Sequence, residues 1–241
     1  MLPQNASQPM SAGAFSESQI AAEQAAFMRK VFGIMSAGLA ATGLTALVVA
    51  HSPTARQIIF GNPFVFFGLL LAELAMVWSF SRVAQKFSSV GTAALFYAYA
   101  IVNGLTFSVF FMRYTTASIE STFFITAGMF AGISAYGFVT KRNLTGMGNM
   151  MIMGLWGLIL ASIVAMFLPG STTLSFGLSV LGVIIFTGLT AYDVQKIKTL
   201  NVIGNAGTDD DHKEAIHGAL ILYLDFINLF IYLLRLTGRR R

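Results

Sequence analysis

The chain has no cysteine among its 241 residues and few charged side chains. Without cysteine it can form neither disulfides nor thiolate metal sites, and thiol catalysis is excluded. Charged residues make up 10% of the sequence, whereas a soluble domain carries about 25%. So few charges cannot cover a water-exposed surface, because hydrophobic residues form 56% of the chain. The composition therefore indicates an integral membrane protein.

Seven apolar runs are each long enough to cross a bilayer as a helix, which takes roughly 20 residues. The segments outside them are too short to build a soluble core. We therefore predict an all-α integral membrane protein with one seven-helix domain over residues 29–236. A flexible cytoplasmic arm, in which a helix can begin at about Glu17, precedes this domain over residues 1–28, and a basic tail follows over residues 237–241. The predicted spans are Val31–Ala50, Phe64–Ser81, Val90–Met112, Ser121–Val139, Met147–Leu168, Leu174–Tyr192 and Ala215–Leu234.

Proline is scarce, with five residues in the chain, and three of these prolines lie between apolar runs. Pro53 and the sequence Gly61-Asn62-Pro63 are predicted to close the first connection, and Pro169-Gly170 a tight fifth connection. Glycine is abundant by contrast and mostly lies inside the runs. Small residues spaced by four, such as Gly128 and Gly132, indicate close packing of membrane helices.

The basic residues predict the orientation of the spans. With the N-terminus in the cytoplasm, nine lysines and arginines near span ends lie inside and two, Arg56 and Arg113, lie outside. This placement indicates helix orientation in an inner membrane rather than binding to nucleic acid, despite the net charge of +5. The basic tail is an exception to the excess of positive charge on the cytoplasmic side, because seven spans place the tail outside. Either it is tolerated there or the last segment re-enters, and we expect seven full spans.

The last span carries Asp225 near its middle. An aspartate near the bilayer centre costs about 2.5–3.5 kcal/mol on insertion scales, so we interpret it as functional. Asn228 lies one turn later and is interpreted as a supporting polar group on the same face, which must point into protein or water. We predict that this helix is the centre of the bundle.

Two further acids lie in or against the membrane. Glu73 is the tenth residue of the second span, and Asp193 follows the sixth span in AYDVQKIK. Each also has a structural interpretation, Glu73 as a hydrogen-bonded glutamate and Asp193 as a helix-end acid bridged to Lys196. Arg82 is the nearest permanent cation, either a partner of Asp193 that closes a cavity or an anchor at the membrane edge.

Asp193 and Asp225 can pair only if the last two helices are antiparallel. The carboxyl groups could then not both ionise at low cost and would share a proton. From Glu214 to Asp225 the chain rises about 16 Å as a helix, which is deeper than Asp193. Pairing therefore requires the last helix to start deeper than Glu214 or to tilt strongly.

Enzyme sites are disfavoured, and no cofactor is expected. The three histidines, His51, His212 and His217, lie at different membrane sides and cannot converge on zinc. Ser134, in GISAYGF, lacks an obvious base and is not in a GxSxG elbow. The aspartates of 209–211 lack the spacing of an EF-hand and are interpreted as a solvated loop.

The segment LYLDFINLFIYLLR, with AYDVQKIK and AIVNGLTFS, resembles the Bax inhibitor-1 family in its bacterial branch. The resemblance implies six helices around a central seventh and a pH-sensitive calcium leak. It places the family's di-aspartyl sensor on Asp193 and Asp225, the acid of calcium passage on Glu73, and the latch arginine on Arg82. Some bacterial relatives are associated with restraint of a membrane-bound quality-control protease.

Two functions follow as hypotheses. The first is a calcium leak channel, shut while the two aspartates are protonated or bridged to each other and opened by their rearrangement, with calcium and protons as partners besides the lipid bilayer. In this hypothesis Asp193, Asp225 and Glu73 are transient calcium ligands. The second is an interaction protein that modulates a membrane protease or a stress response without conducting ions. A partner would bind its polar N-terminal arm.

Overall fold

The computed structural model describes residues 15–167 and 172–241. Within these residues the regular elements are helices, and one isolated bridge joins Tyr114 to Arg240. Seven helices are long and apolar enough to cross a membrane, which confirms the predicted all-α fold with seven spans. The helices are α1 (Glu17–His51), α2 (Pro53–Phe60), α3 (Pro63–Ala84), α4 (Ser89–Arg113), α5 (Thr116–Val139), α6 (Thr145–Met166), α7 (Thr172–Leu200) and α8 (Asp209–Thr237).

The first connection contains a short helix, α2, where the sequence predicted only helix-breaking residues. Pro53 and Pro63 each stand at the start of a helix. Proline is tolerated there because the first helical N–H has no intrahelical acceptor. Ser52 and Asn62 cap these helices through their side-chain oxygens. The predicted turn at Pro169-Gly170 lies outside the described residues.

The first spanning helix begins well before the membrane domain predicted from the sequence. Ser16 caps α1 in a capping box with Gln19, and the helix runs on without a break to His51. Phe27 and Met28 are already buried in the bundle. Residues 17–28 of the predicted arm are therefore helical, and residues 1–14 lie outside the described part of the chain.

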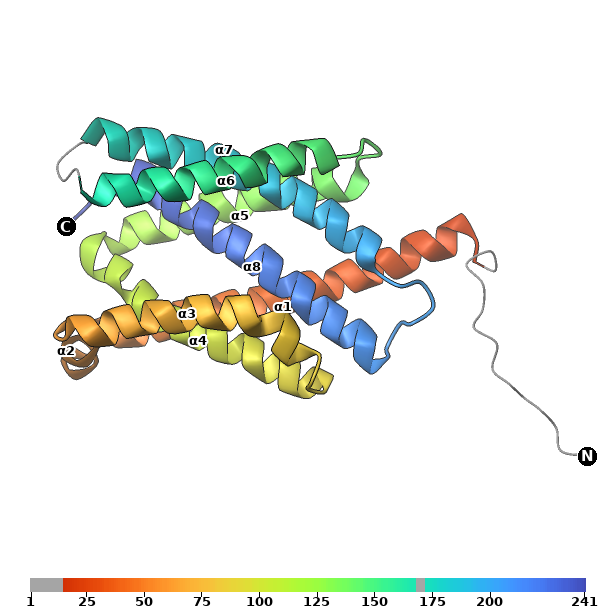
Figure 1. Cartoon of the computed structure of the whole chain (residues 1–241), viewed down its shortest axis with the longest axis horizontal. Helices are drawn as coiled ribbons and strands as arrows, with labels where there is room; N and C mark the ends of the chain where they lie inside the picture. The colour runs from red at the N-terminus through yellow and green to blue at the C-terminus, as the bar shows by residue number, and fades with distance from the viewer. Residues whose placement is uncertain (1–14, 168–171) are drawn as a thin grey trace, which may run out of the picture.

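The helix α8 lies at the centre of the bundle and crosses it obliquely (Figure 1). It packs against α1, α4, α5 and α7. In the most apolar 18 residues of each helix, 61% are buried in α8, against 44% in α4 and α7 and 6% in α3. The central position predicted for the last span is thus observed.

The two ends of the bundle carry different connections (Figure 1). We call the end where α1 begins the N-terminal end, and the end where α8 stops the C-terminal end. One unbroken α8 crosses between them, so the last segment does not re-enter. The basic tail then docks on the α4–α5 connection, where Arg239 N–H donates to Ser118 Oγ and Arg241 N–H to Arg113 O.

A glycine in α4, Gly104, allows α1 and α4 to approach each other closely. A Cβ at Gly104 would lie 2.7 Å from the carbonyl oxygen of Thr42, so no larger residue fits without moving the backbone. Gly128 and Gly132, which the sequence pattern favoured for packing, have no neighbouring atom within 4 Å of such a Cβ. For this pair, spacing by four did not indicate a helix contact, because the spacing does not tell which helix face is inward.

The aspartates of residues 209–211 form the first turn of α8 rather than a solvated loop. Thr208 caps this helix, and Asp211 is buried. Lys30 Nζ donates to Asp211 Oδ2 at 2.5 Å, and Gly207 N–H donates to the same oxygen at 2.8 Å. Asp209 accepts from the N–H of Ser89 at the start of α4. The α7–α8 connection is thereby fastened to α1 and α4.

We predict that Asp211→Asn destabilises the protein by about 1–3 kcal/mol, because the buried carboxylate loses its ion pair with Lys30. The matched control is Asp210→Asn, one position earlier, whose side chain is 83% exposed. This control should change the stability by no more than about 0.5 kcal/mol. Thermal unfolding in detergent micelles measures the difference, and equal midpoints for the two variants would contradict the prediction.

Candidate functional site

Two carboxyl groups meet where α7 crosses α8. The side chains of Asp193 and Asp225 lie close enough to form a hydrogen bond with each other. Such a bond needs a proton on one of the two groups, since a carboxylate is only an acceptor. Asp225 is 5% exposed, whereas Asp193 is half-buried. The contact is therefore a proton-holding pair of which one member is enclosed and the other is closer to the surface.

The antiparallel register of α7 and α8 brings these carboxyl groups to one level. A start deeper than Glu214 is one of the two geometries that allow the pair, but the helix starts earlier, at Asp209. The second geometry is a tilted last helix, and α8 crosses the bundle obliquely in Figure 1. Contacts along the crossing run antiparallel, with Gly218 facing Ile197 and Gly182 facing Tyr232. The first turns of α8 thus extend beyond the end of α7, and Asp225 comes level with Asp193.

The charged group nearest the pair is Lys196. Its positive charge acts on Asp193 from one turn further along α7. Among the described residues, Asp193 is the charged group that acts on Asp225, and Asp225 Oδ2 is buried without a hydrogen-bond partner. The guanidinium of Arg82, the proposed latch, lies 4.9 Å from the ring centroid of Trp78 and makes no ion pair within the described residues.

Glu73 lies at a second polar site, between α3 and α4. Its carboxyl oxygens accept hydrogen bonds from Thr106 Oγ1 at 2.7 Å and from Asn103 Nδ2 at 3.3 Å. The hydrogen-bonded glutamate that the sequence offered as the structural interpretation is therefore present. The same bonds hold the carboxyl group at a fixed place on the wall of a cavity.

A chain of hydrogen bonds continues from this site through α8 to α1. Tyr223, which is fully buried, donates to Asn103 Oδ1 at 3.1 Å. Its hydroxyl also lies 2.6 Å from Thr42 Oγ1. Sequence reasoning did not single out Tyr223, Thr42 or the polar residues of α4. The available signal was Asn103 and Thr106 within AIVNGLTFS, one turn apart in an apolar span.

The cavity beside Glu73 has a volume of about 780 Å³ and lies between α3, α4 and α8. Asn228 and Arg235 line it from α8, and Trp78 lines it from α3. Asn228 was expected to share a face with Asp225. Instead it lines the Glu73 cavity, while Asp225 faces Asp193, because residues three apart on a helix point about 60° apart. The Asn228 side chain also donates to Leu224 O.

The three membrane acids do not converge on one site. Glu73 belongs to the cavity between α3, α4 and α8, and the two aspartates belong to the α7–α8 crossing. Within the described residues, no group of three histidine, aspartate or glutamate side chains is placed to hold a metal ion. The expected ligand set of Asp193, Asp225 and Glu73 is therefore not assembled in this structure. Two separate polar sites remain beside α8, the carboxyl pair at the α7–α8 crossing and the cavity lined by Glu73.

Comparison with known proteins finds relatives that match most of this chain and most of their own length. A model of the family described as "Inhibitor of apoptosis-promoting Bax1" matches residues 24–241. The inner membrane protein YbhL of Escherichia coli K12 is 46% identical over 216 residues, which cover 89% of this chain and 92% of that protein. An uncharacterized protein of Borreliella burgdorferi is 47% identical over 215 residues, covering 89% and 92%. One from Deinococcus radiodurans is 40% identical, covering 89% and 90%.

The match spans most of the chain and includes all seven membrane-spanning helices. The segments that carry the sequence resemblance, in α4, α7 and α8, are also those that supply the paired aspartates and the polar network around Glu73. The chain is accordingly a multi-pass membrane protein that belongs to the Bax inhibitor-1 family.

Proposed function

We propose that the protein is a calcium leak channel that is shut while Asp193 and Asp225 share a proton. The observation that carries this proposal is the pair of close carboxyl groups at the crossing of α7 and α8. A polar pair of this kind is expensive in a membrane span and is a functional site by default. The fold supports a mechanical role, because α8 contacts four other spans.

The protonation of the pair sets the strength of the α7–α8 contact. With one shared proton, the hydrogen bond runs to an ionised carboxylate and is roughly twice as strong as a neutral bond. The remaining negative charge is also attracted by Lys196. A second proton removes both effects. Acidification therefore weakens the bridge, and the leak rises as the pH falls.

Glu73 is the residue that we propose attracts the cation. Its carboxyl group lies on the wall of a cavity of about 780 Å³ that also reaches α8. Carboxylate and amide oxygens, here those of Glu73 and Asn228, are the ligand types that calcium prefers. Movement of α8 after loss of the bridge would change this cavity, because Asn228 lies one turn from Asp225 on the same helix.

We also propose that the N-terminal end of the bundle faces the cytoplasm. The nine basic residues counted on the inner side lie near that end, and the rule of positive charge on the cytoplasmic side favours it. The Asp193–Asp225 pair would then respond to cytoplasmic protons, because Asp193 is seven residues from the end of α7 at that side.

In proteoliposomes loaded with a calcium indicator, we expect the wild-type leak to rise as the pH falls from roughly 8 to 5, across the titration of the pair. In Asp225→Asn the amide donates to Asp193 whatever the pH, and a single carboxyl group titrates. The midpoint of the pH dependence should therefore move, and its amplitude should fall.

Asp210→Asn is the matched control for this experiment, since it makes the same chemical change on the exposed start of α8. Its pH profile should follow the wild type. Identical profiles for wild type and Asp225→Asn would refute the pair as the sensor. Background-level flux in every variant would refute the leak itself and favour the interaction protein.

The change Glu73→Gln should lower the calcium flux by about tenfold, because the loss of about 1.4 kcal/mol of attraction for the cation is enough for that factor. Glutamine keeps an oxygen that accepts from Thr106, so the fold should be retained. Glu120→Gln on α5 removes an exposed acid in the same way and serves as the control. An unchanged flux in Glu73→Gln would exclude Glu73 from the ion path.

A further inference from the structure

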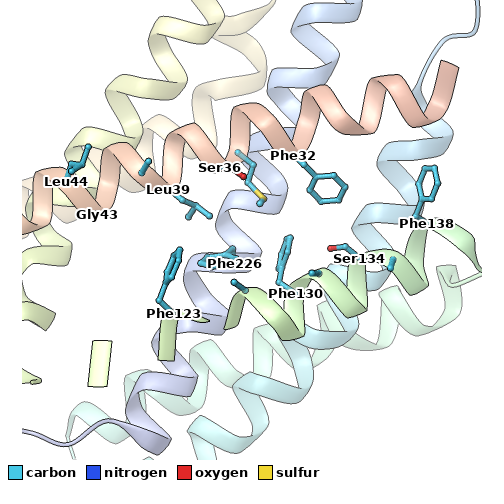
Figure 2. A pocket seen from close by; sticks show the side chains of 15 residues that line it. Phe32, Ser36, Leu39, Gly43, Leu44, Phe123, Phe130, Ser134, Phe138 and Phe226 are labelled. Atoms are coloured by element: carbon cyan, nitrogen blue, oxygen red, sulfur yellow. The ribbon is translucent and has the colours of Figure 1, made fainter. Parts of the chain in front are cut away.

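A groove separates α1 from α5 on one side of the bundle. Both helices pack on α8, but they do not pack against each other along their length. The space between them is a cavity of about 840 Å³, and Phe226 of α8 lies at its floor (Figure 2). A second cavity of about 370 Å³ continues it toward the C-terminal end and shares Leu39 and Phe123 with it. The groove is thus long, narrow and open at the side of the bundle.

Its walls are apolar and carry several aromatic rings. Four phenylalanines of α1 and α5 line the larger cavity along its length. Figure 2 shows their rings projecting from both helices into the space between them. These residues are Phe32, Phe123, Phe130 and Phe138. Leu44 and Phe123 remain 64% and 42% exposed, so the groove opens onto the hydrocarbon core of the bilayer.

One polar atom inside the groove lacks a partner. Ser134 lines it from α5, and its side chain is shown between Phe130 and Phe138 in Figure 2. The residue is 5% exposed, and its Oγ makes no hydrogen bond within the described residues. A buried hydroxyl without a partner destabilises a protein, so this atom indicates a ligand that brings a hydrogen-bond acceptor or donor.

The charges at the two ends of the groove are opposite. At the N-terminal end, Arg29 precedes Phe32 by one turn and Lys141 follows Phe138 by three residues, both exposed. Lys198 Nζ lies 4.8 Å from the ring centroid of Phe138 and donates to Phe138 O. At the other end the smaller cavity reaches the exposed acid Glu120. An anionic group is therefore favoured at the N-terminal end alone.

We propose that the groove holds one acyl chain of an anionic phospholipid. The chain lies along the phenylalanine rings, and the hydroxyl of Ser134 donates to the ester carbonyl. The phosphate then lies at Arg29 and Lys141, because Ser134 is one turn, about 6 Å, from Phe138 at the basic end. The two contacts thus match the order of tail, ester and phosphate in the lipid.

A flexible acyl chain fits this groove better than a helix from another protein. Alanines spaced by four, Ala127, Ala131 and Ala135, line the groove from α5 as they would at a helix contact, but large rings also project into the groove from both walls and hold a helix backbone away from these alanines. A helix would also have no counterpart for the single hydroxyl of Ser134 beside the basic end. The inference does not depend on ion conduction and concerns a different face of α8.

The test uses the full chain in nanodiscs that contain equal amounts of phosphatidylglycerol and phosphatidylcholine with the same acyl chains. After extraction into detergent, native mass spectrometry counts the lipids that stay bound. Ala40→Phe fills the groove from α1, since Ala40 lines it. Retention of phosphatidylglycerol should fall about tenfold, the change expected for the loss of about two methylene contacts.

Ala37→Phe is the matched control, because Ala37 is exposed on the same helix and does not line the groove. It should retain the lipid as the wild type does. Arg29→Gln with Lys141→Gln, both at exposed positions, should abolish the preference for phosphatidylglycerol over phosphatidylcholine while a lipid is still held. This double variant also tests the proposal if Ala40→Phe does not fold.

A phosphatidylglycerol with a diazirine in the middle of one acyl chain locates the occupant directly. We expect its adducts on α1 and α5 to be more frequent than those of the matching phosphatidylcholine probe. Equal retention by Ala40→Phe and Ala37→Phe, or adducts without any excess on α1 and α5, would overturn the proposal. So would cross-links that place a second copy of the chain in the groove.

Discussion

The buried polar side chains of α8 constrain the whole bundle, because hydrocarbon offers them no hydrogen-bond partner. Asp225 meets its partner on α7, and Tyr223 meets partners on α4 and α1. These bonds require three neighbouring helices to approach the central one at fixed levels. The close approach of α1 and α4 at Gly104 then brings Thr42 within reach of Tyr223. The oblique path of α8 brings Tyr223 and Asp225 to these partners on three different helices.

Two sites of different chemistry share this one helix. The proton-holding pair lies on its α7 face, and the Glu73 cavity lies on the face toward α3 and α4. Asp225 and Asn228 are three residues apart, so a rigid rotation or shift of α8 would change both sites at once. In the proposed leak channel, this shared helix would couple the protonation of the pair to the cation path. The ion pair of Lys30 and Asp211 holds the first turn of the same helix and limits how far it can move.

The apolar groove is the place where other helices do not fully cover α8. Four spans pack on this helix, yet α1 and α5 leave an open groove between them, with the buried side chain of Phe226 at its floor. In water such a surface would collapse or attract a partner, whereas in a bilayer lipid can cover it. An acyl chain there would act as part of the wall around the central helix. The bundle would then depend on lipid for one of its lateral contacts.

The sequence by itself determined the all-α membrane class, the number of spans and which acids lie in or against the membrane. Each of these depends on local composition and length. Seven apolar runs, and aspartates placed inside them, are visible without any contact. The pairing of Asp193 with Asp225 was decided by the antiparallel register of α7 and α8, and rise along the helix alone had argued against it. Tertiary structure also separated Glu73 from the pair, turned Asn228 toward a different cavity, and selected Gly104 rather than Gly128 for packing. These outcomes depend on which helix lies beside which face, and residue spacing along one chain does not contain that information.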